Sequence, residues 1–135
     1  MILLDTHALL WWIEDQGHLP KKLTKRVARE LPILVSPVSF WELAMLVERG
    51  RVSIDRNLLR WTRELLHTGQ VEVAELTPQA AIIAAQLKDF RGDPADRLIY
   101  ATAGELKIAL ISKDRQMHEH SRRYPGVQVL WESEL

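Results

Sequence analysis

Four acidic residues stand next to predicted strand and helix boundaries, where carboxylates from distant parts of the chain can meet. Asp5 and Asp114 each end a short apolar run that is typical of a buried strand, ILLD and ALISKD. Glu42 and Asp96 fall in the first turns of two predicted helices. Ligands of an open parallel sheet bind in the crevice beyond the carboxyl ends of its strands, so these four acids are predicted to converge there.

A cluster of four carboxylates is unfavourable when it is empty, because like charges raise one another's pKa values. A bound divalent cation relieves this repulsion. Ligands that are all oxygen suit Mg²⁺ or Mn²⁺, which keep several waters and bind substrate phosphate. The pattern therefore favours a magnesium or manganese site at Asp5, Glu42, Asp96 and Asp114.

Each acid also has a purely structural explanation. Ser39 and Glu42 match a capping box, in which Glu42 reaches back to the backbone of Ser39. Asp93, followed by proline, predicts a helix start that puts Asp96 at the third helical position, where the helix dipole favours a carboxylate. The other two acids could cap the helices that follow them. The residues alone leave the metal site and the capping explanation both open.

The elements that must position the acids are predicted from the apolar pattern. Short apolar runs bounded by turn residues predict strands at 2–4, 33–35, 71–74, 108–111 and 127–130. Helices are predicted after Asp5 through Ile13, and from Pro20 with Leu23, Val27 and Leu31 on one stripe. The segment 36–39 leads into a third helix, which carries Phe40 and stops at Gly50. Further helices are predicted from a cap at Asp55 to Gly69, from Thr77-Pro78, and from Asp93-Pro94. Strands that are apolar throughout and alternate with helices predict an α/β fold with a parallel sheet covered on both faces.

The composition is that of an ordinary soluble globular protein. A length of 135 residues predicts one domain. The chain has no cysteine, which excludes disulfides and thiolate metal sites and agrees with a reducing cytoplasm. The charges of its 18 basic and 18 acidic residues cancel, so general electrostatic attraction of the whole chain to nucleic acid is not expected. Asp5 and His7 interrupt the first apolar stretch, so neither a signal peptide nor a membrane span is expected there.

Four blocks, LLDTHALLWW, SFWELAMLVERGRV, GDPADRLIYATA and ALISKD, resemble the successive blocks of PIN-domain toxins of the VapC type. The resemblance runs from Ile2 to about Asp114, with matching order and spacing. It implies a three-layer α/β/α fold with a central, mostly parallel sheet, and a single PIN domain over residues 1–135. It also implies a metal-dependent endoribonuclease, the toxin of a type II toxin–antitoxin system. RNA would be its substrate, a cognate antitoxin would occlude its active site, and it would form a homodimer in the cytoplasm.

The resemblance also implies roles for individual residues. By their positions in these blocks, Asp5, Glu42, Asp96 and Asp114 are the acids expected to bind Mg²⁺ or Mn²⁺ and to catalyse hydrolysis of RNA phosphodiester bonds. Asp5 and Asp96 would hold the ion and its activated water, while Glu42 and Asp114 would complete the ligand shell or orient water. Asp96 is preferred to Asp93 because it directly precedes the run RLIYA, which leaves Asp93 as the helix cap or as a partner outside the ligand shell.

Several other residues invite a chemical role. His118 and His120 are two positions apart and so do not share a helix face, which disfavours a zinc site. His7 follows Asp5 closely but is expected to be a surface or packing residue. Arg97 is expected either to contact phosphate or to pair with an acid, and the sequence does not separate these two roles.

The chain has five tryptophans, of which most are expected to pack in the core. A further hypothesis is that Trp11, Trp12 or the helical pair at 40–61 contacts an antitoxin helix or a second copy of the chain. The rival function is a non-catalytic or receiver-like Mg²⁺-binding module for signalling or protein interaction. A receiver needs a phosphoacceptor aspartate at the end of a strand midway along the chain, and the middle strand here ends at Ser36.

Overall fold

The computed structural model describes residues 1–14 and 16–131, and within them the strands form one sheet. The strands are β1 (Ile2–Leu4), β2 (Ile33–Val35), β3 (Val71–Val73), β4 (Ala109–Ile111) and β5 (Val129–Leu130). The helices are α1 (Thr6–Glu14), the 3-10 helix η1 (Gln16–His18), α2 (Lys21–Arg29), α3 (Pro37–Glu48), α4 (Leu58–His67), α5 (Pro78–Gln86), α6 (Pro94–Leu106) and α7 (Arg115–Arg123).

The sheet has the strand order β3-β2-β1-β4-β5, and every strand pair is parallel. Central β1 pairs with β2 through Leu3 and Leu34, and with β4 through Leu3 and Leu110. The chain builds outwards from β1 to β3 on one side and then crosses to β4 on the other. The order of the strands therefore reverses between β1 and β4, and such a switch point is where parallel sheets bind ligands.

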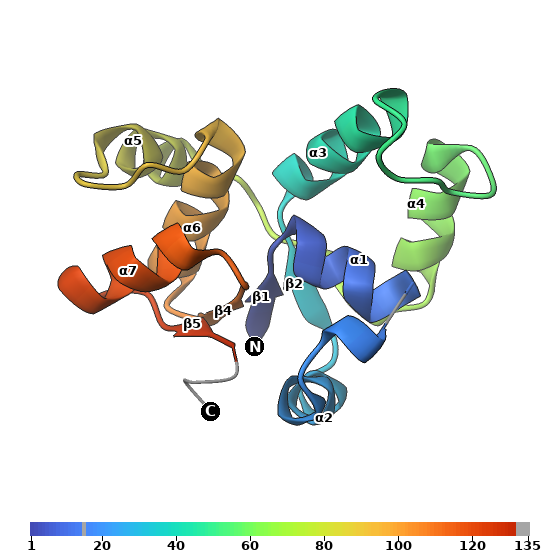
Figure 1. Cartoon of the computed structure of the whole chain (residues 1–135), viewed down its shortest axis with the longest axis horizontal. Coiled ribbons are helices and arrows are strands. Elements are labelled where there is room, and N and C mark those ends of the chain that lie inside the picture. The colour runs from blue at the N-terminus through green and yellow to red at the C-terminus, as the bar shows by residue number, and fades with distance from the viewer. Residues whose placement is uncertain (15, 132–135) are drawn as a thin grey trace.

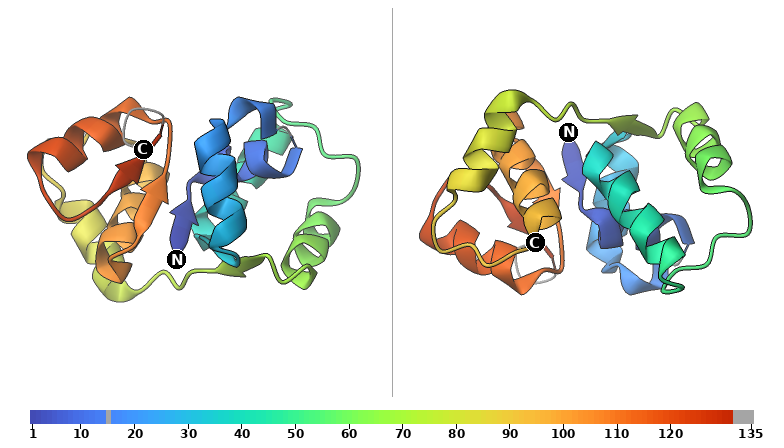
Figure 2. Two further views of the ribbon diagram at one scale, coloured as in Figure 1. Left: turned by 90° about the horizontal axis from the view of Figure 1, so that it is seen from below. Right: turned by 90° about the horizontal axis from the view of Figure 1, so that it is seen from above.

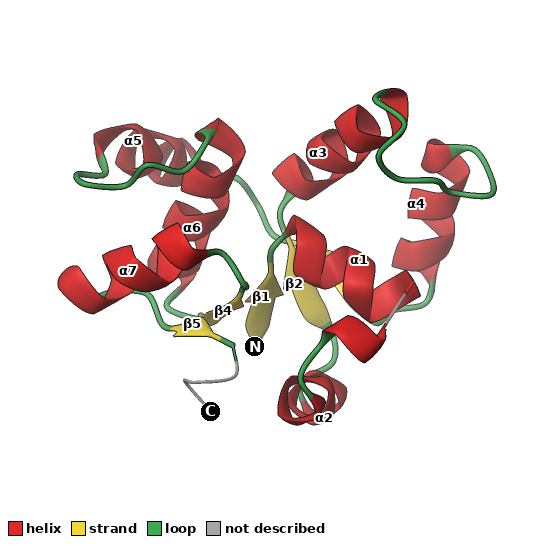
Figure 3. Cartoon of the chain, viewed as in Figure 1, coloured by secondary structure: helices red, strands yellow, loops and turns green. Residues whose placement is uncertain are grey.

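Helices cover both faces of the sheet, as Figures 1 and 3 show, with α1 to α4 on one side and α5 to α7 on the other. The two views in Figure 2 show the same division. Side chains of a strand alternate between its faces, so Ile2 and Leu4 enter the core under the first group while Leu3 enters the core under the second. Burial on both faces explains why the strands are apolar throughout. The predicted three-layer α/β/α architecture is confirmed.

Several predicted element boundaries are wrong in detail. The helix predicted from Pro20 ends at Arg29, so Leu31 lies outside it and is 38% exposed instead of joining the buried stripe. Asn57, and not Asp55, caps α4, because the Asn57 side chain accepts from two backbone N–H groups. The strands predicted at 108–111 and 127–130 are shorter at their amino ends. No helix in the described part of the chain has the length and apolar character needed to cross a membrane.

Candidate active site

Asp5 lies at the carboxyl end of β1, on the edge where the parallel strands end. Its backbone N–H donates to the carbonyl of Ile111, which continues the β1–β4 pairing. One carboxylate oxygen accepts from the Ala8 N–H at 2.9 Å and so caps α1, while the other accepts from the Ser112 hydroxyl. The side chain is 8% exposed, and burial raises its pKa while these two hydrogen bonds oppose the rise.

Asp114 follows β4 and is tied to Asp5 through Ser112, which is fully buried between them. The Ser112 hydroxyl donates to Asp5 and accepts from the Asp114 N–H at 3.0 Å. One carboxylate oxygen of Asp114 caps α7 by accepting from the N–H groups of Gln116 and Met117. The capping explanation is therefore correct for Asp5 and Asp114, and it does not remove either of them from the site.

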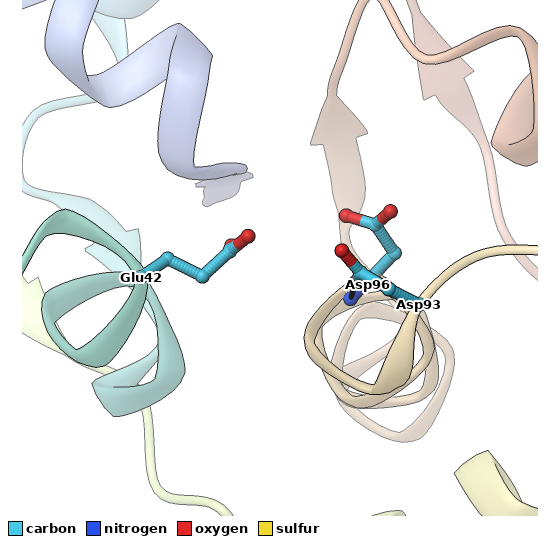
Figure 4. A group of neighbouring side chains, drawn as sticks. All are labelled: Glu42, Asp93 and Asp96. Carbon is cyan, nitrogen blue, oxygen red and sulfur yellow. Dashed lines mark hydrogen bonds between the residues drawn. The ribbon is translucent and has the colours of Figure 1, made fainter. Parts of the chain in front are cut away.

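Glu42 reaches the same edge from α3 and does not form the predicted capping box. Ser36 caps α3, since its hydroxyl accepts from the Val38 N–H at 3.1 Å, and Pro37 occupies the first turn. Glu42 instead accepts a hydrogen bond from the Thr6 hydroxyl, which also lies 3.0 Å from the hydroxyl of Ser39. Burial raises the pKa of Glu42. Because Glu42 does not cap α3, its carboxylate is free to extend from α3 towards the start of α6 (Figure 4).

Asp93 and Asp96 enter from the start of α6. The Asp93 side chain accepts from the Asp96 N–H at 2.8 Å and caps the helix, as predicted. Carboxylate oxygens of Glu42, Asp93 and Asp96 lie within 4.8 Å of one another, and Figure 4 shows the three side chains gathered between α3 and α6. Burial first, and then the charges of four neighbouring acids, raise the pKa of Asp96 to about 8. The cluster is therefore electrostatically strained in the absence of a cation.

All four predicted acids, together with Asp93, line one cavity of about 490 Å³ at the switch point of the sheet. The lining residues are Asp5, His7, Trp11, Glu42, Asp93, Asp96, Lys113 and Asp114. Sequence reasoning missed the hydroxyls that hold the acids and the cavity positions of Trp11 and Lys113. Thr6 and Ser112 lie within two residues of a predicted ligand, and this adjacency is the signal that could have identified them.

Comparison with known proteins identifies the fold that carries this site. The sequence model of the PIN domain matches residues 2–123. The chain belongs to the PIN-domain family. Ribonuclease VapC22 of Mycobacterium tuberculosis is 35% identical over 131 residues, which covers 96% of this chain and 98% of that protein. The resemblance of the sequence to PIN-domain toxins of the VapC type is confirmed.

Solved structures with the PIN-domain fold include VapBC2 from Rickettsia felis bound to a DNA fragment from its promoter. That chain superposes with a TM-score of 0.67 at 16% identity and covers 98% of this chain and 100% of its own. A toxin–antitoxin complex from Klebsiella pneumoniae has a TM-score of 0.60 at 15% identity, with coverages of 94% and 95%. At these identities the two structures describe the shared fold alone.

Arg97 has a structural role in this PIN domain, and the predicted pairing of its guanidinium with an acid is wrong. Its guanidinium donates to four backbone carbonyls, those of Ala84, Ala85, Leu87 and Phe90. Two of these carbonyls belong to the last turn of α5, which has no further turn to satisfy them. Arg97 therefore links α5 and the segment that follows it to α6, one residue after Asp96.

The histidines of α7 are also structural. His118 is buried, with Nε2 2.7 Å from the Ser112 carbonyl oxygen. His120 is buried 2.8 Å from the Tyr100 hydroxyl and 3.0 Å from the Lys88 carbonyl oxygen. The two rings therefore have separate hydrogen-bond partners. His7, in contrast, is exposed and lines the cavity of the acids.

The tryptophans divide between core and surface. Trp61 is buried, and Trp12 and Trp131 pack against the same core while partly exposed. Trp41, on α3, is 56% exposed and is an exception to the prediction that most of the tryptophans pack in the core. Trp11 follows neither pattern, because it lines the cavity of the acids.

Proposed function

We propose that this chain is a metal-dependent endoribonuclease, the toxin of a toxin–antitoxin pair, which hydrolyses RNA phosphodiester bonds. The observation that carries the proposal is the gathering of five carboxylates in one cavity at the switch point of a PIN-domain sheet. A relative at 35% identity along nearly the whole chain is a ribonuclease, which supports the choice of RNA. Residues 1–135 form a single PIN domain in this proposal, because β5 pairs with β4 and so extends the family's sheet beyond residue 123.

The residues of the cavity fit a divalent cation well. Its donors are carboxylate oxygens, which Mg²⁺ and Mn²⁺ prefer, and those of Glu42, Asp93 and Asp96 already lie within 4.8 Å of one another. Burial and then the charges of neighbouring acids raise the pKa of Asp96 to about 8, and a bound cation would offset the repulsion among these acids. Asp5, Glu42, Asp96 and Asp114 would hold the ion, with Asp93 beside them. When bound, such an ion lowers the pKa of a coordinated water and offsets the charge that develops on the phosphoryl group.

Two hydroxyl groups of the protein hold the carboxylates of the site in position. Ser112 couples Asp5 to the backbone of Asp114, so these two carboxylates keep one relative position. Thr6, the first residue of α1, donates a hydrogen bond that holds the Glu42 carboxylate. Rigid support of this kind places charge before the substrate arrives, and losing it typically costs about 10- to 100-fold in metal affinity or activity. Glu42 and Asp114 would complete the ligand shell of a bound ion or orient the attacking water.

We further propose a cognate antitoxin and a second copy of the chain as protein partners. Similar solved structures include a toxin–antitoxin complex, and this chain exposes large apolar side chains that a partner would cover, among them Trp41, Leu59 and Ile82. A toxin that cuts cellular RNA acts where that RNA lies, so we place the protein in the cytoplasm. The receiver-like alternative lacks a phosphoacceptor aspartate at the end of a strand midway along the chain, because β2 is followed by the buried Ser36 and β3 by the buried Ala74.

The test is cleavage of end-labelled transfer RNAs and structured RNAs by the purified protein with Mg²⁺ or Mn²⁺. We expect discrete cuts that disappear with EDTA and with Asp5→Asn. Cuts that persist with both would identify a contaminating nuclease and refute the assignment. Metal binding without cleavage of any cellular RNA would favour the non-catalytic module instead.

A further inference from the structure

The cavity that holds the acids is also lined by an aromatic and a basic side chain that the proposed chemistry does not use. Trp11 and Lys113 both line the 490 Å³ cavity with the carboxylates. The Lys113 Nζ lies 6.0 Å from the centroid of the Trp11 ring, within the range of a cation–π contact. The two side chains are therefore neighbours in the fold, although they are about a hundred residues apart in the sequence.

The Trp11 ring is held in a defined orientation by its neighbours. His18 stacks on it at 5.5 Å between ring centroids and an interplanar angle of 13°. Trp131 and His7 lie at 5.9 Å and 5.7 Å in tilted arrangements. The next residue, Trp12, packs against the core of the domain, whereas Trp11 faces the cavity and remains partly exposed. A pre-oriented aromatic ring beside a catalytic cluster is a suitable surface for stacking a nucleic acid base.

Lys113 supplies positive charge where the cavity is otherwise acidic. Its backbone is fixed between Ser112 and Asp114, while its own side chain is exposed. Among the described residues that line the cavity, five are carboxylates, and Lys113 and His7 are the basic ones. A substrate with one negative charge per nucleotide needs a cation beside the phosphates that a metal site does not reach. Lys113 is placed to provide it.

We propose that Trp11 and Lys113 form a nucleotide-binding subsite for unpaired RNA. The indole stacks on the base of a nucleotide next to the cleaved bond, and the ammonium contacts a phosphate of the same strand. The subsite rests on the proposed ribonuclease function and names two residues that would position the RNA strand beside the acids.

The test measures binding of short RNAs by fluorescence anisotropy in Mg²⁺, in the Asp96→Asn background so that the probe is not cut. One probe is a 12-residue oligoadenylate, and the other is the same sugar–phosphate backbone without bases. Trp11→Leu keeps an apolar side chain but removes the ring, and Trp11→Phe keeps a ring. We expect Trp11→Leu to weaken binding of the oligoadenylate by roughly 5- to 150-fold, Trp11→Phe to weaken it less, and neither to change binding of the baseless probe.

Lys113 is tested through the salt dependence of the same binding. Loss of one phosphate contact lowers the slope of log affinity against log salt concentration by roughly 0.7 for a single strand. We expect this change for Lys113→Gln and no change for Lys25→Gln, which removes an exposed lysine from α2. Equal slopes for the two variants would overturn the role of Lys113.

Failure of the subsite is distinguishable from failure of the proposed function. Trp11→Leu protein that binds both probes as the parent does, alongside wild-type protein that cleaves RNA, would overturn the subsite and leave the ribonuclease intact. Base-dependent binding through Trp11 in a protein that cleaves no RNA would support the subsite and refute the ribonuclease. Circular dichroism of each variant confirms that the fold is retained, and Lys113→Gln provides an independent arm if Trp11→Leu does not fold.

Discussion

Neutralising Asp96 should stabilise the metal-free protein. Partial burial, and then the charges of four neighbouring acids, raise the pKa of Asp96 to about 8, because this environment disfavours the charged carboxylate. Asparagine has the same shape and no charge, and the Asp96 backbone N–H would still donate to Asp93. Asp96→Asn therefore removes repulsion while leaving the start of α6 intact.

The magnitude follows from the pKa. A pKa of about 8 in the fold against an ordinary value of 3.8 corresponds at pH 7 to an upper limit of about 4 kcal/mol. Asp96 is only partly buried, so solvent screening reduces the expected gain to about 1–2 kcal/mol. For a domain of this size the unfolding midpoint should rise by about 3–8 °C.

The raised pKa of Asp96 also determines how the stability of the metal-free protein changes with pH. Between about pH 4 and pH 8 the folded chain keeps a proton on Asp96 that the unfolded chain has lost, so stability of the metal-free wild type falls as pH rises through this window. The advantage of Asp96→Asn should therefore vanish near pH 4. Excess Mg²⁺ should stabilise the wild type more than the variant, because a ligand stabilises the state that binds it.

The assay is thermal unfolding in EDTA, followed by circular dichroism from pH 4 to pH 8. Glu75→Gln is the matched control, since it neutralises an exposed carboxylate between β3 and α5 that is not part of the cavity lining. A variant as unstable as the wild type at pH 7, or one whose advantage does not depend on pH, would refute the account of repulsion among the acids.

Three further changes test the supports of the site. Ser112→Ala removes the hydroxyl that Asp5 accepts from, and we expect about 1.5–3 kcal/mol lower stability in chemical denaturation and about 10- to 100-fold slower RNA cleavage. Arg97→Lys cannot reproduce a four-carbonyl fork and should cost about 2–3 kcal/mol in the same denaturation experiment; unchanged stability would contradict the structural role. Gly92→Ala would place a Cβ 2.3 Å from Cε1 of Phe90, so we expect a loss of about 1–3 kcal/mol, which an unshifted unfolding midpoint would contradict.

The sheet and the convergence of the acids follow directly from local sequence signals. Fully apolar runs such as ILL and ALI indicate strands buried on both faces, and an aspartate just beyond each run marks the edge where parallel strands end. The helix starts at Thr77 and Asp93 were predicted correctly, because a capping side chain followed by proline is a strong signal. The same signal, Ser36 followed by Pro37, identifies the true cap of α3 and was overridden by the apparent capping box at Ser39.

The remaining features depend on tertiary packing. Arg97 donates to backbone carbonyls at the carboxyl end of α5, and the residues next to Arg97 in the sequence give no signal of these partners. Trp11 and Trp12 are adjacent and of the same type, yet one lines the cavity and the other the core. The helical phase of Leu9, Trp12 and Ile13 was available to separate them, because residues three and four apart share a face.

The central claim is that the gathered acids form one cation-dependent ribonuclease site, and the most direct test is the rate of RNA cleavage as a function of Mn²⁺ concentration. The rate should rise to saturation for the wild type and for Glu75→Gln, and it should be lost for Asp5→Asn, Glu42→Gln, Asp96→Asn and Asp114→Asn. A rate that does not depend on Mn²⁺, or that survives replacement of these acids, would contradict the account.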